Sequence, residues 1–144
     1  FYSEEIRKYA KMYLAACEKS GKQVGIHAHN NQQLGYANTI EAIVNGVNRL
    51  DATISGLGRG AGNCPLELLI GFLKNPRYRL RPILECIEGT VEPLRAHMQW
   101  GFDLPYLVTG LLNQHPRAAM EYLDKPVSER ESIVEFYDAA MEQV

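Results

Sequence analysis

The first half of the chain alternates between two hydrophobic periodicities. Apolar residues spaced three and four apart predict helices near residues 3–20, 34–44 and 63–73, because that spacing puts them on one helix face. Alternating apolar residues predict short strands over residues 23–29 and 48–54. The order helix, strand, helix, strand, helix is typical of parallel β/α units, in which a right-handed crossover returns the chain to the same sheet.

Residues that commonly begin or end helices mark these segments. Ser3 is positioned to cap the first helix, Gly46 to stop the second, and Asn63 to cap the third, with Pro65 tolerated in its first turn. Two parallel strands need further neighbours and cover on both faces. We therefore expect this region to belong to a larger sheet or barrel.

After Pro76 the pattern is helical and is interrupted by prolines. We expect short helices over residues 82–88, 91–100, 104–113 and 116–124. A last helix follows Ser128 and Glu131, which stand at capping-box spacing. Its apolar stripe is Ile133, Val134, Tyr137, Ala140 and Met141. The pattern predicts an α/β region over residues 1–75 and a helical region over residues 76–144.

Composition narrows the class of protein. The 144 residues are 46% hydrophobic and 22% charged, with a net charge of −2, which is typical of a packed soluble protein and disfavours nucleic-acid binding. No apolar run approaches the roughly 18 residues of a membrane span. Cys17, Cys64 and Cys86 form no Cys-x-x-Cys pair, so we expect free thiols and a cytoplasmic protein. The chain opens on Phe1, almost inside a helix, and we expect it to continue a longer protein.

Two histidines at the end of the first predicted strand are the strongest candidate for chemistry. His27 and His29 are two residues apart, so their side chains point the same way from backbone positions about 6.6 Å apart, while Ala28 faces the other side. Two imidazoles on one face can bind a metal such as Zn, Mn, Fe or Ni. The alternative is that both histidines pack at a strand end. The polar turn that follows them favours the metal site.

The glycine-rich loop of residues 55–63 is a weak nucleotide motif. It lacks the Gly-Lys-Ser/Thr ending of a P-loop and the spacing of a dinucleotide fingerprint. Its glycines more plausibly let the backbone approach a ligand at the carboxyl end of the second strand. Arg59 is positioned either to bind a substrate carboxylate or to stay solvated, and Asn63 either to cap a helix or to face the metal.

A third metal ligand and a nucleophile are harder to place. The nearest acidic residues are Asp51, Glu41 and Glu67. We disfavour Glu41, which belongs on a helix surface, and Asp51, which lies within a strand. Cys64 has no histidine near it in sequence and fits a small buried cysteine better than a nucleophile. No catalytic residue is assigned in this segment.

Four stretches together resemble one family. GIHAHNN at residues 25–31, LGYAN at 34–38, DAT at 51–53 and GLGRGAGN at 56–63 are similar, in this order, to the DRE-TIM metallolyases, which include 4-hydroxy-2-oxovalerate aldolase, hydroxymethylglutaryl-CoA lyase and the isopropylmalate and homocitrate synthases. The resemblance covers residues 1–75. It implies an α/β fold in which this segment supplies strands seven and eight of a TIM (β/α)8 barrel.

The same resemblance implies roles for individual residues. His27 and His29 match the metal-binding histidines of the family, and Asn63 matches its asparagine at or near the metal. We take Gly58, Arg59 and Asn31 as candidate substrate-contacting residues.

The loop sequence at residues 58–67 is most similar to that of the hydroxy-oxovalerate aldolases. The lyase branch carries a catalytic cysteine in a longer loop, and the loop of this chain has none. The synthases carry His-Asn-Asp where this chain has Asn30 and Asn31. The family's Arg-Asp stretch on the first barrel strand has no counterpart here. We therefore expect the carboxy-terminal part of an enzyme, inactive as an isolated fragment.

The implied activity is that of a divalent-metal aldolase that cleaves a 4-hydroxy-2-oxo acid to pyruvate and an aldehyde. Mn or Mg is the expected ion, with Zn and Co as alternatives, and an oligomer is expected. Alternative activities are an acyl-CoA-condensing synthase or a hydroxymethylglutaryl-CoA-type lyase. A different class of function is a noncatalytic module whose helical region docks a partner, as a helical region of the resembling aldolases contacts a dehydrogenase.

Overall fold

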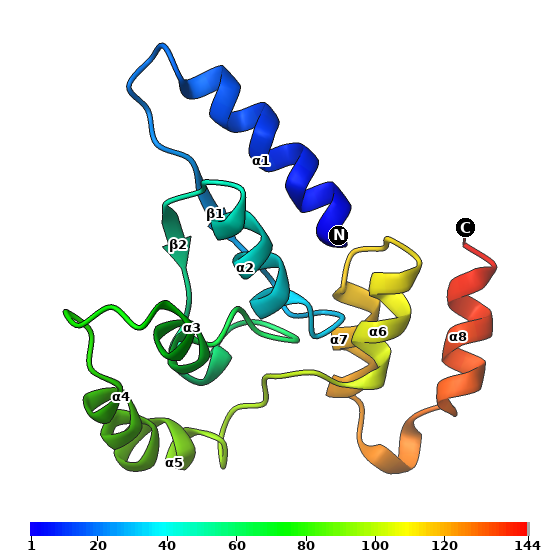
Figure 1. The fold of residues 1–144 in the computed structure, drawn as a ribbon. Helices are drawn as coiled ribbons and strands as arrows, with labels where there is room; N and C mark the ends of the chain where they lie inside the picture. The colour runs from blue at the N-terminus through cyan, green and yellow to red at the C-terminus, as the bar shows by residue number, and fades with distance from the viewer. Residues whose placement is uncertain (144) are drawn as a thin grey trace.

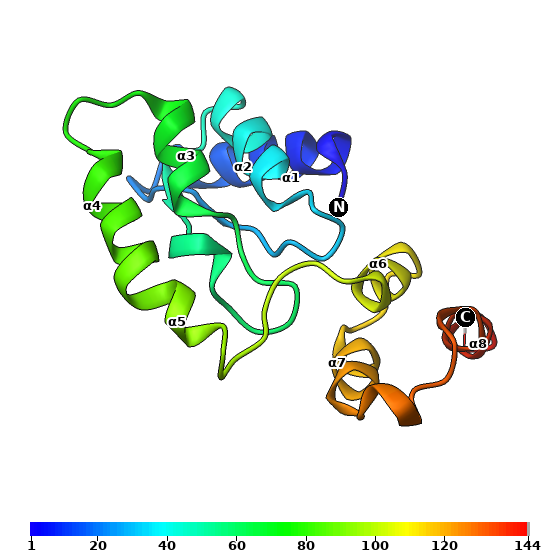
Figure 2. The same cartoon turned by 90° about the horizontal axis from the view of Figure 1, so that it is seen from below.

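The computed structural model describes residues 1–143 as two short strands and a series of helices (Figure 1). The helices and strands are α1 (Ser3–Cys17), β1 (Gly25–His27), α2 (Gly35–Val44), β2 (Arg49–Asp51), α3 (Leu66–Leu73), α4 (Leu80–Cys86), α5 (Glu92–Leu94), α6 (Leu104–Leu111), α7 (Arg117–Asp124) and α8 (Ile133–Met141). Single turns lie at Ile54–Gly56, Ile87–Val91 and Val127–Glu129. Figures 1 and 2 show α6, α7 and α8 grouped beside the part that contains the sheet.

The two strands are parallel, as the alternation of helices and strands predicts. Gly25 pairs with Arg49, Ile26 with Leu50, and His27 with Asp51. Ile26 and Leu50 pack against a core formed with α1 and α2, whose buried members are Ala10, Ala42 and Val47. The alternate residues of both strands are exposed on the opposite face. The histidine-bearing face of the sheet is therefore the one turned away from α1 and α2.

Both strands end earlier than predicted, because residues at the end of the glycine-rich loop form the backbone hydrogen bonds beyond their carboxyl ends. Cys64 N–H donates to Ala28 O at 3.0 Å, and Thr53 N–H donates to Cys64 O at 3.0 Å. Asn30 N–H donates to Gly62 O at 3.0 Å. Residues 62–64 thus run between the ends of β1 and β2 and satisfy backbone groups that a longer ladder would use.

Two predicted N-caps are wrong. Asn63 does not cap α3, because it lies two residues before Pro65, the observed N-cap; its side-chain amide donates to Leu57 O at 3.2 Å. Ser3 lies inside α1, and the cap position is Tyr2, whose N–H donates to a Glu5 carboxylate oxygen at 2.9 Å. In both cases the observed helix boundary lies one or two residues from the predicted cap.

The predicted helix over residues 91–100 is present only at its start, as α5. The helical run that starts with α4 passes through a π turn, Ile87–Val91, and ends with α5 at Leu94. Pro93 has no N–H to donate to the preceding turn, which weakens the helix there. The expected helices over 104–113 and 116–124 are present as α6 and α7. No helix within residues 1–143 is long and apolar enough to cross a membrane.

The last helix begins four residues later than its predicted capping box. The observed box joins Ser132 and Glu135: Ser132 Oγ accepts from Glu135 N–H at 3.2 Å, and Glu135 Oε2 accepts from Ser132 N–H at 2.8 Å. Ser132 rather than Ser128 is the N-cap, because it directly precedes the apolar residues of α8 that pack against α6 and α7. Buried Phe136 and Ala140 join a core with α6 and α7, whereas Val134, Tyr137 and Met141 of the predicted stripe are exposed.

Replacing Ser132 by alanine should lower the free energy of unfolding by about 1 kcal/mol, since it removes an N-cap acceptor. Ser128→Ala is the matched control and should change it by less than about 0.5 kcal/mol. Urea denaturation monitored by circular dichroism measures both. Equal effects of the two substitutions would contradict the assignment of the cap.

Candidate functional site

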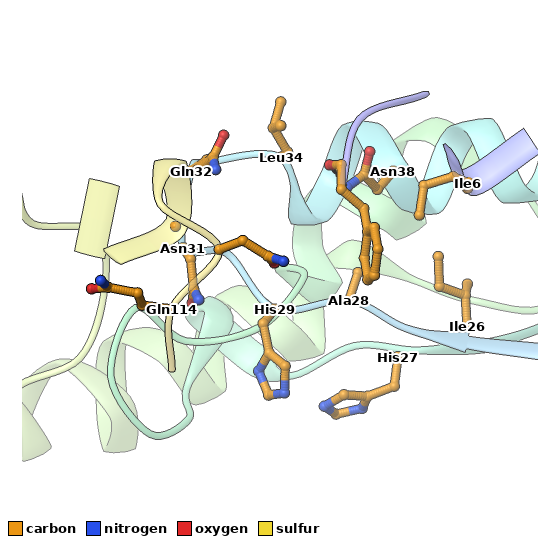
Figure 3. A pocket seen from close by; sticks show the side chains of 13 residues that line it. Ile6, Ile26, His27, Ala28, His29, Asn31, Gln32, Leu34, Asn38 and Gln114 are labelled. Atoms are coloured by element: carbon orange, nitrogen blue, oxygen red, sulfur yellow. Dashed lines mark hydrogen bonds between the residues drawn. The ribbon is translucent and has the colours of Figure 1, made fainter. Parts of the chain in front are cut away.

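The two histidines lie on one side of the first strand and just beyond its end. Figure 3 shows both imidazoles pointing to the same side, with Ile26 and Ala28 pointing to the other. The ring centroids of His27 and His29 are 5.0 Å apart, and the rings are inclined at 76°. Both residues are exposed. The pair therefore presents two nitrogen ligands on an accessible face.

Asp51 of β2 lies directly opposite His27. Its Oδ2 atom is 3.3 Å from Nδ1 of His27. A carboxylate that accepts from Nδ1–H fixes the ring and leaves Nε2 available as a ligand atom. The sequence placed Asp51 only as a disfavoured third ligand. Its position in the centre of the second strand was the sequence feature that could have suggested this pairing.

Asn63 lies beside His29, with which it forms an isolated antiparallel bridge. Its side-chain amide is held under the loop by Leu57 O, and Gly58 leaves room for it: a Cβ atom at Gly58 would overlap Nδ2 of Asn63. A side chain at position 58 would therefore displace the Asn63 amide. Arg59, the next residue, is exposed on the loop.

The histidines line a cavity of about 320 Å³ (Figure 3). Its lining combines the two histidine residues with amide side chains and an apolar wall, but the imidazoles themselves point to the side opposite Ile26 and Ala28. The lining residues outside the histidines and their neighbours are Phe1, Ile6, Asn31, Gln32, Leu34, Asn38, Gly110, Asn113 and Gln114. The structure thus brings His27, His29 and Asn31 to one cavity, while Gly58, Arg59 and Asn63 are not among its lining residues. No signal in the sequence indicated that α6 and the residues after it would line this cavity, through Gly110, Asn113 and Gln114.

The acidic candidates each have another partner. Glu41 pairs with Arg7 at 3.0 Å, and the pKa of its carboxyl is lowered, first by the hydrogen bond from Arg7. A Glu67 carboxylate oxygen accepts from Ser55 N–H at 2.9 Å. Cys64 is 0% exposed, and burial raises the pKa of its thiol, which fits a packed cysteine rather than a nucleophile.

The donor set fits part of a metal site. Two imidazoles suit a divalent ion of the first transition row. Within residues 1–143, however, no three side chains of His, Cys, Asp or Glu gather closely enough to hold a metal ion. His27 and His29 would thus supply two ligands of a set that these residues do not complete.

Comparison with known proteins identifies a family. The HMGL-like family profile matches residues 4–85. Oxaloacetate decarboxylase of Mycobacterium tuberculosis is 43% identical over 74 residues, which cover 51% of this chain and 21% of the relative. The 4-hydroxy-2-oxovalerate aldolase of Thermus thermophilus is 38% identical over 95 residues, which cover 63% of this chain and 27% of the relative.

A solved structure is similar over most of the chain. The N-terminal domain of a candidate aldolase from Bacteroides vulgatus superposes with a TM-score of 0.67 at 33% identity, covering 90% of this chain and 43% of that one. The chain thus spans about a quarter of the length of the curated relatives that it matches. Since the profile matches more than half of its residues, the chain belongs to the HMGL-like family, whose matched relatives include aldolases and a decarboxylase.

Proposed function

We propose that this chain is part of a lyase that breaks the bond between C3 and C4 of a 4-hydroxy-2-oxo acid and yields pyruvate and an aldehyde. The observation that carries the proposal is the exposed His27–His29 pair on one side of β1 and its extension, whose rings lie 5.0 Å apart. The similarity to 4-hydroxy-2-oxovalerate aldolases supports the substrate class. Residues 1–75 would be the last units of a TIM barrel and residues 76–144 its helical region.

His27 and His29 would hold a divalent ion, Mn or Mg first, with Zn or Co as alternatives. Such an ion supplies Lewis acidity, which stabilises negative charge on the oxygens of a 2-oxo acid. Asp51 would hold the His27 ring in one tautomer, and Asn63 would lie beside His29. The third ligand and the base that takes the hydroxyl proton would come from the rest of the barrel.

The candidate substrate residues have different roles in this proposal. Asn31 lines the cavity, and its amide would donate to a substrate oxygen. Arg59 is exposed, so it would reach a substrate carboxylate only from the loop above the site. Gly58 would contribute by leaving space for the Asn63 amide.

Oxaloacetate decarboxylation is the second candidate, because the relative with that name is 43% identical to this chain. Both reactions break the C3–C4 bond of a 2-oxo acid and leave a pyruvate enolate. They differ in the fragment that departs: an aldehyde after loss of the hydroxyl proton, or carbon dioxide without it. The decarboxylation therefore needs no base for a hydroxyl group.

The test uses the protein in which this chain is joined to the rest of its barrel, with Mn²⁺ added. 4-Hydroxy-2-oxovalerate and oxaloacetate are supplied separately, and pyruvate is followed by coupling to lactate dehydrogenase. We expect pyruvate and acetaldehyde from the first substrate, and no cleavage by the isolated 144 residues. Pyruvate from oxaloacetate alone, above the rate with Mn²⁺ and no protein, supports the decarboxylase. Cleavage of neither substrate contradicts both.

The noncatalytic alternative makes the helical region a docking module for a partner, such as a dehydrogenase. It is tested with the same protein, since a module would bind its partner and show no turnover. An oligomeric state also belongs to the proposal and is measured by sedimentation.

A further inference from the structure

Ser55, at the start of the glycine-rich loop, is held through each of its polar groups. Its φ angle is 54°, in the left-handed region that non-glycine residues rarely adopt. Its N–H donates to Glu67, its carbonyl accepts from Trp100 Nε1–H at 3.0 Å, and its hydroxyl accepts from Arg95 Nη2 at 3.3 Å. Such a conformation persists where its surroundings determine it several times over.

Two of these contacts come from a segment beyond the residues that match the family. Arg95 and Trp100 follow α5, whereas the family match ends at residue 85. The Arg95 guanidinium carbon is 4.3 Å from the centre of the Trp100 ring, within the range of a cation–π contact. Trp100 is 8% exposed. Buried Trp100 and the more exposed Arg95, which also pairs with Glu92, thus contact each other and both bond to Ser55.

The same segment holds the loop at its far side. Gly101 N–H donates to Gly60 O at 3.1 Å. A Cβ atom at Gly60 would lie 3.2 Å from the ring of buried Tyr106 in α6, so the loop backbone runs close against that ring. The loop is thus fixed both at its start and near its tip.

Three short steps connect Trp100 to the candidate site. Trp100 binds Ser55, and the neighbouring Gly56 carbonyl accepts from Asn63 N–H at 3.0 Å. Asn63 in turn pairs with His29. Gly62 and Cys64 also bond to Asn30 and Ala28, so a loop released from Trp100 would lose one of several restraints on Asn63.

We propose that Trp100 and Arg95 are positioning residues that fix the glycine-rich loop and thereby hold Asn63 beside His29. The helical region then has a role inside the site. The placement of the loop stands on the contacts above, and its consequence for metal binding rests on the proposed function.

The test exploits the fact that Trp100 is the single tryptophan of the chain, so one indole N–H signal reports on it in ¹H–¹⁵N spectra. Trp100→Phe keeps an aromatic ring and removes the donor. Arg95→Gln removes the cation, and Arg95→Lys restores it. Arg81→Gln is the matched control, because Arg81 pairs with Glu85 on exposed α4, outside these contacts.

We expect slow exchange of the indole N–H in the wild-type chain. In Trp100→Phe, amides of residues 55–63 should exchange about fivefold to tenfold faster, as loss of one hydrogen bond implies. The Asn63 amide and His29 ring signals should shift with them. Arg95→Gln should show a smaller change that Arg95→Lys partly reverses, and Arg81→Gln none. Amides of α1 and α8 should be unchanged in all four variants.

Faster exchange throughout the chain would overturn the proposal, since it would show a merely structural Trp100. So would a released loop whose Asn63 and His29 signals stay in place. In the longer protein, Mn²⁺ affinity gives the second readout. A wild-type protein that binds no Mn²⁺ contradicts the proposed function, whereas equal Mn²⁺ binding by wild type and Trp100→Phe contradicts the positioning role.

Discussion

Alanine in place of His27 or His29 should lower kcat/KM for carbon–carbon cleavage at least about 100-fold in the longer protein. Loss of residues that only orient metal ligands already costs about 10–100-fold, and each of these imidazoles would be a ligand itself. The two rings lie 5.0 Å apart on one side of the strand, so either alone would hold the ion weakly. Mn²⁺ affinity should fall in parallel with the rate.

The matched control is His97→Ala, because His97 is exposed and is not among the cavity residues. It should leave kcat/KM and Mn²⁺ affinity within about twofold of wild type. Steady-state kinetics and calorimetric Mn²⁺ titration provide the measurements. Wild-type rates in either His27→Ala or His29→Ala would remove the histidine pair from the site. Unchanged partner binding, with no turnover to lose, would favour the docking module.

Alanine in place of Gly62 should lower the free energy of unfolding by about 3 kcal/mol, through steric overlap and backbone strain. A Cβ atom there would overlap the carbonyl oxygen of Gly56, and Gly62 has a φ of 78°. The Gly56 carbonyl has little freedom to move away, because it accepts from Asn63 N–H. Gly62 itself accepts from Asn30 N–H beyond the end of β1. The substitution therefore strains the junction between the loop and the histidine strand.

Gly71→Ala is the matched control for this loss. Gly71 is exposed within α3, and a Cβ atom there meets nothing within 4 Å. Alanine should raise the free energy of unfolding by about 0.5–1 kcal/mol, since glycine is the poorer helix former. Urea titrations compare the two variants. If Gly62→Ala were as stable as wild type, the backbone of residues 62–64 could not follow the path described here.

Local pattern predicted the α/β part better than the details of its ends. The helix and strand order, the parallel pairing and the shared direction of His27 and His29 all follow from spacing along the chain. The errors lie where two local signals compete. Ser128 and Ser132 are each followed by a glutamate three positions later, so both fit a capping box. Asn63 precedes α3, but its side-chain amide donates to Leu57 O. Packing chose between them.

At the candidate site, too, some features follow from the sequence and others only from the fold. The sequence identified the neighbouring residues His27, His29 and Asn31, because neighbouring positions and a family motif are local information. It could not place Asp51 against His27, since that contact depends on the register of two strands 24 residues apart. The sequence also contained no indication that Gly110 of α6 would line the cavity.

What the sequence by itself determined is which residues form helices and strands, which faces they present, and the family to which the chain belongs. Tertiary structure alone decided how the glycine-rich loop runs. Residues 62–64 enter between the strand ends, and Trp100 binds Ser55 across 45 positions. Such contacts depend on the path of the backbone in space, because a hydrogen bond between distant residues forms only after many intervening dihedral angles have been set.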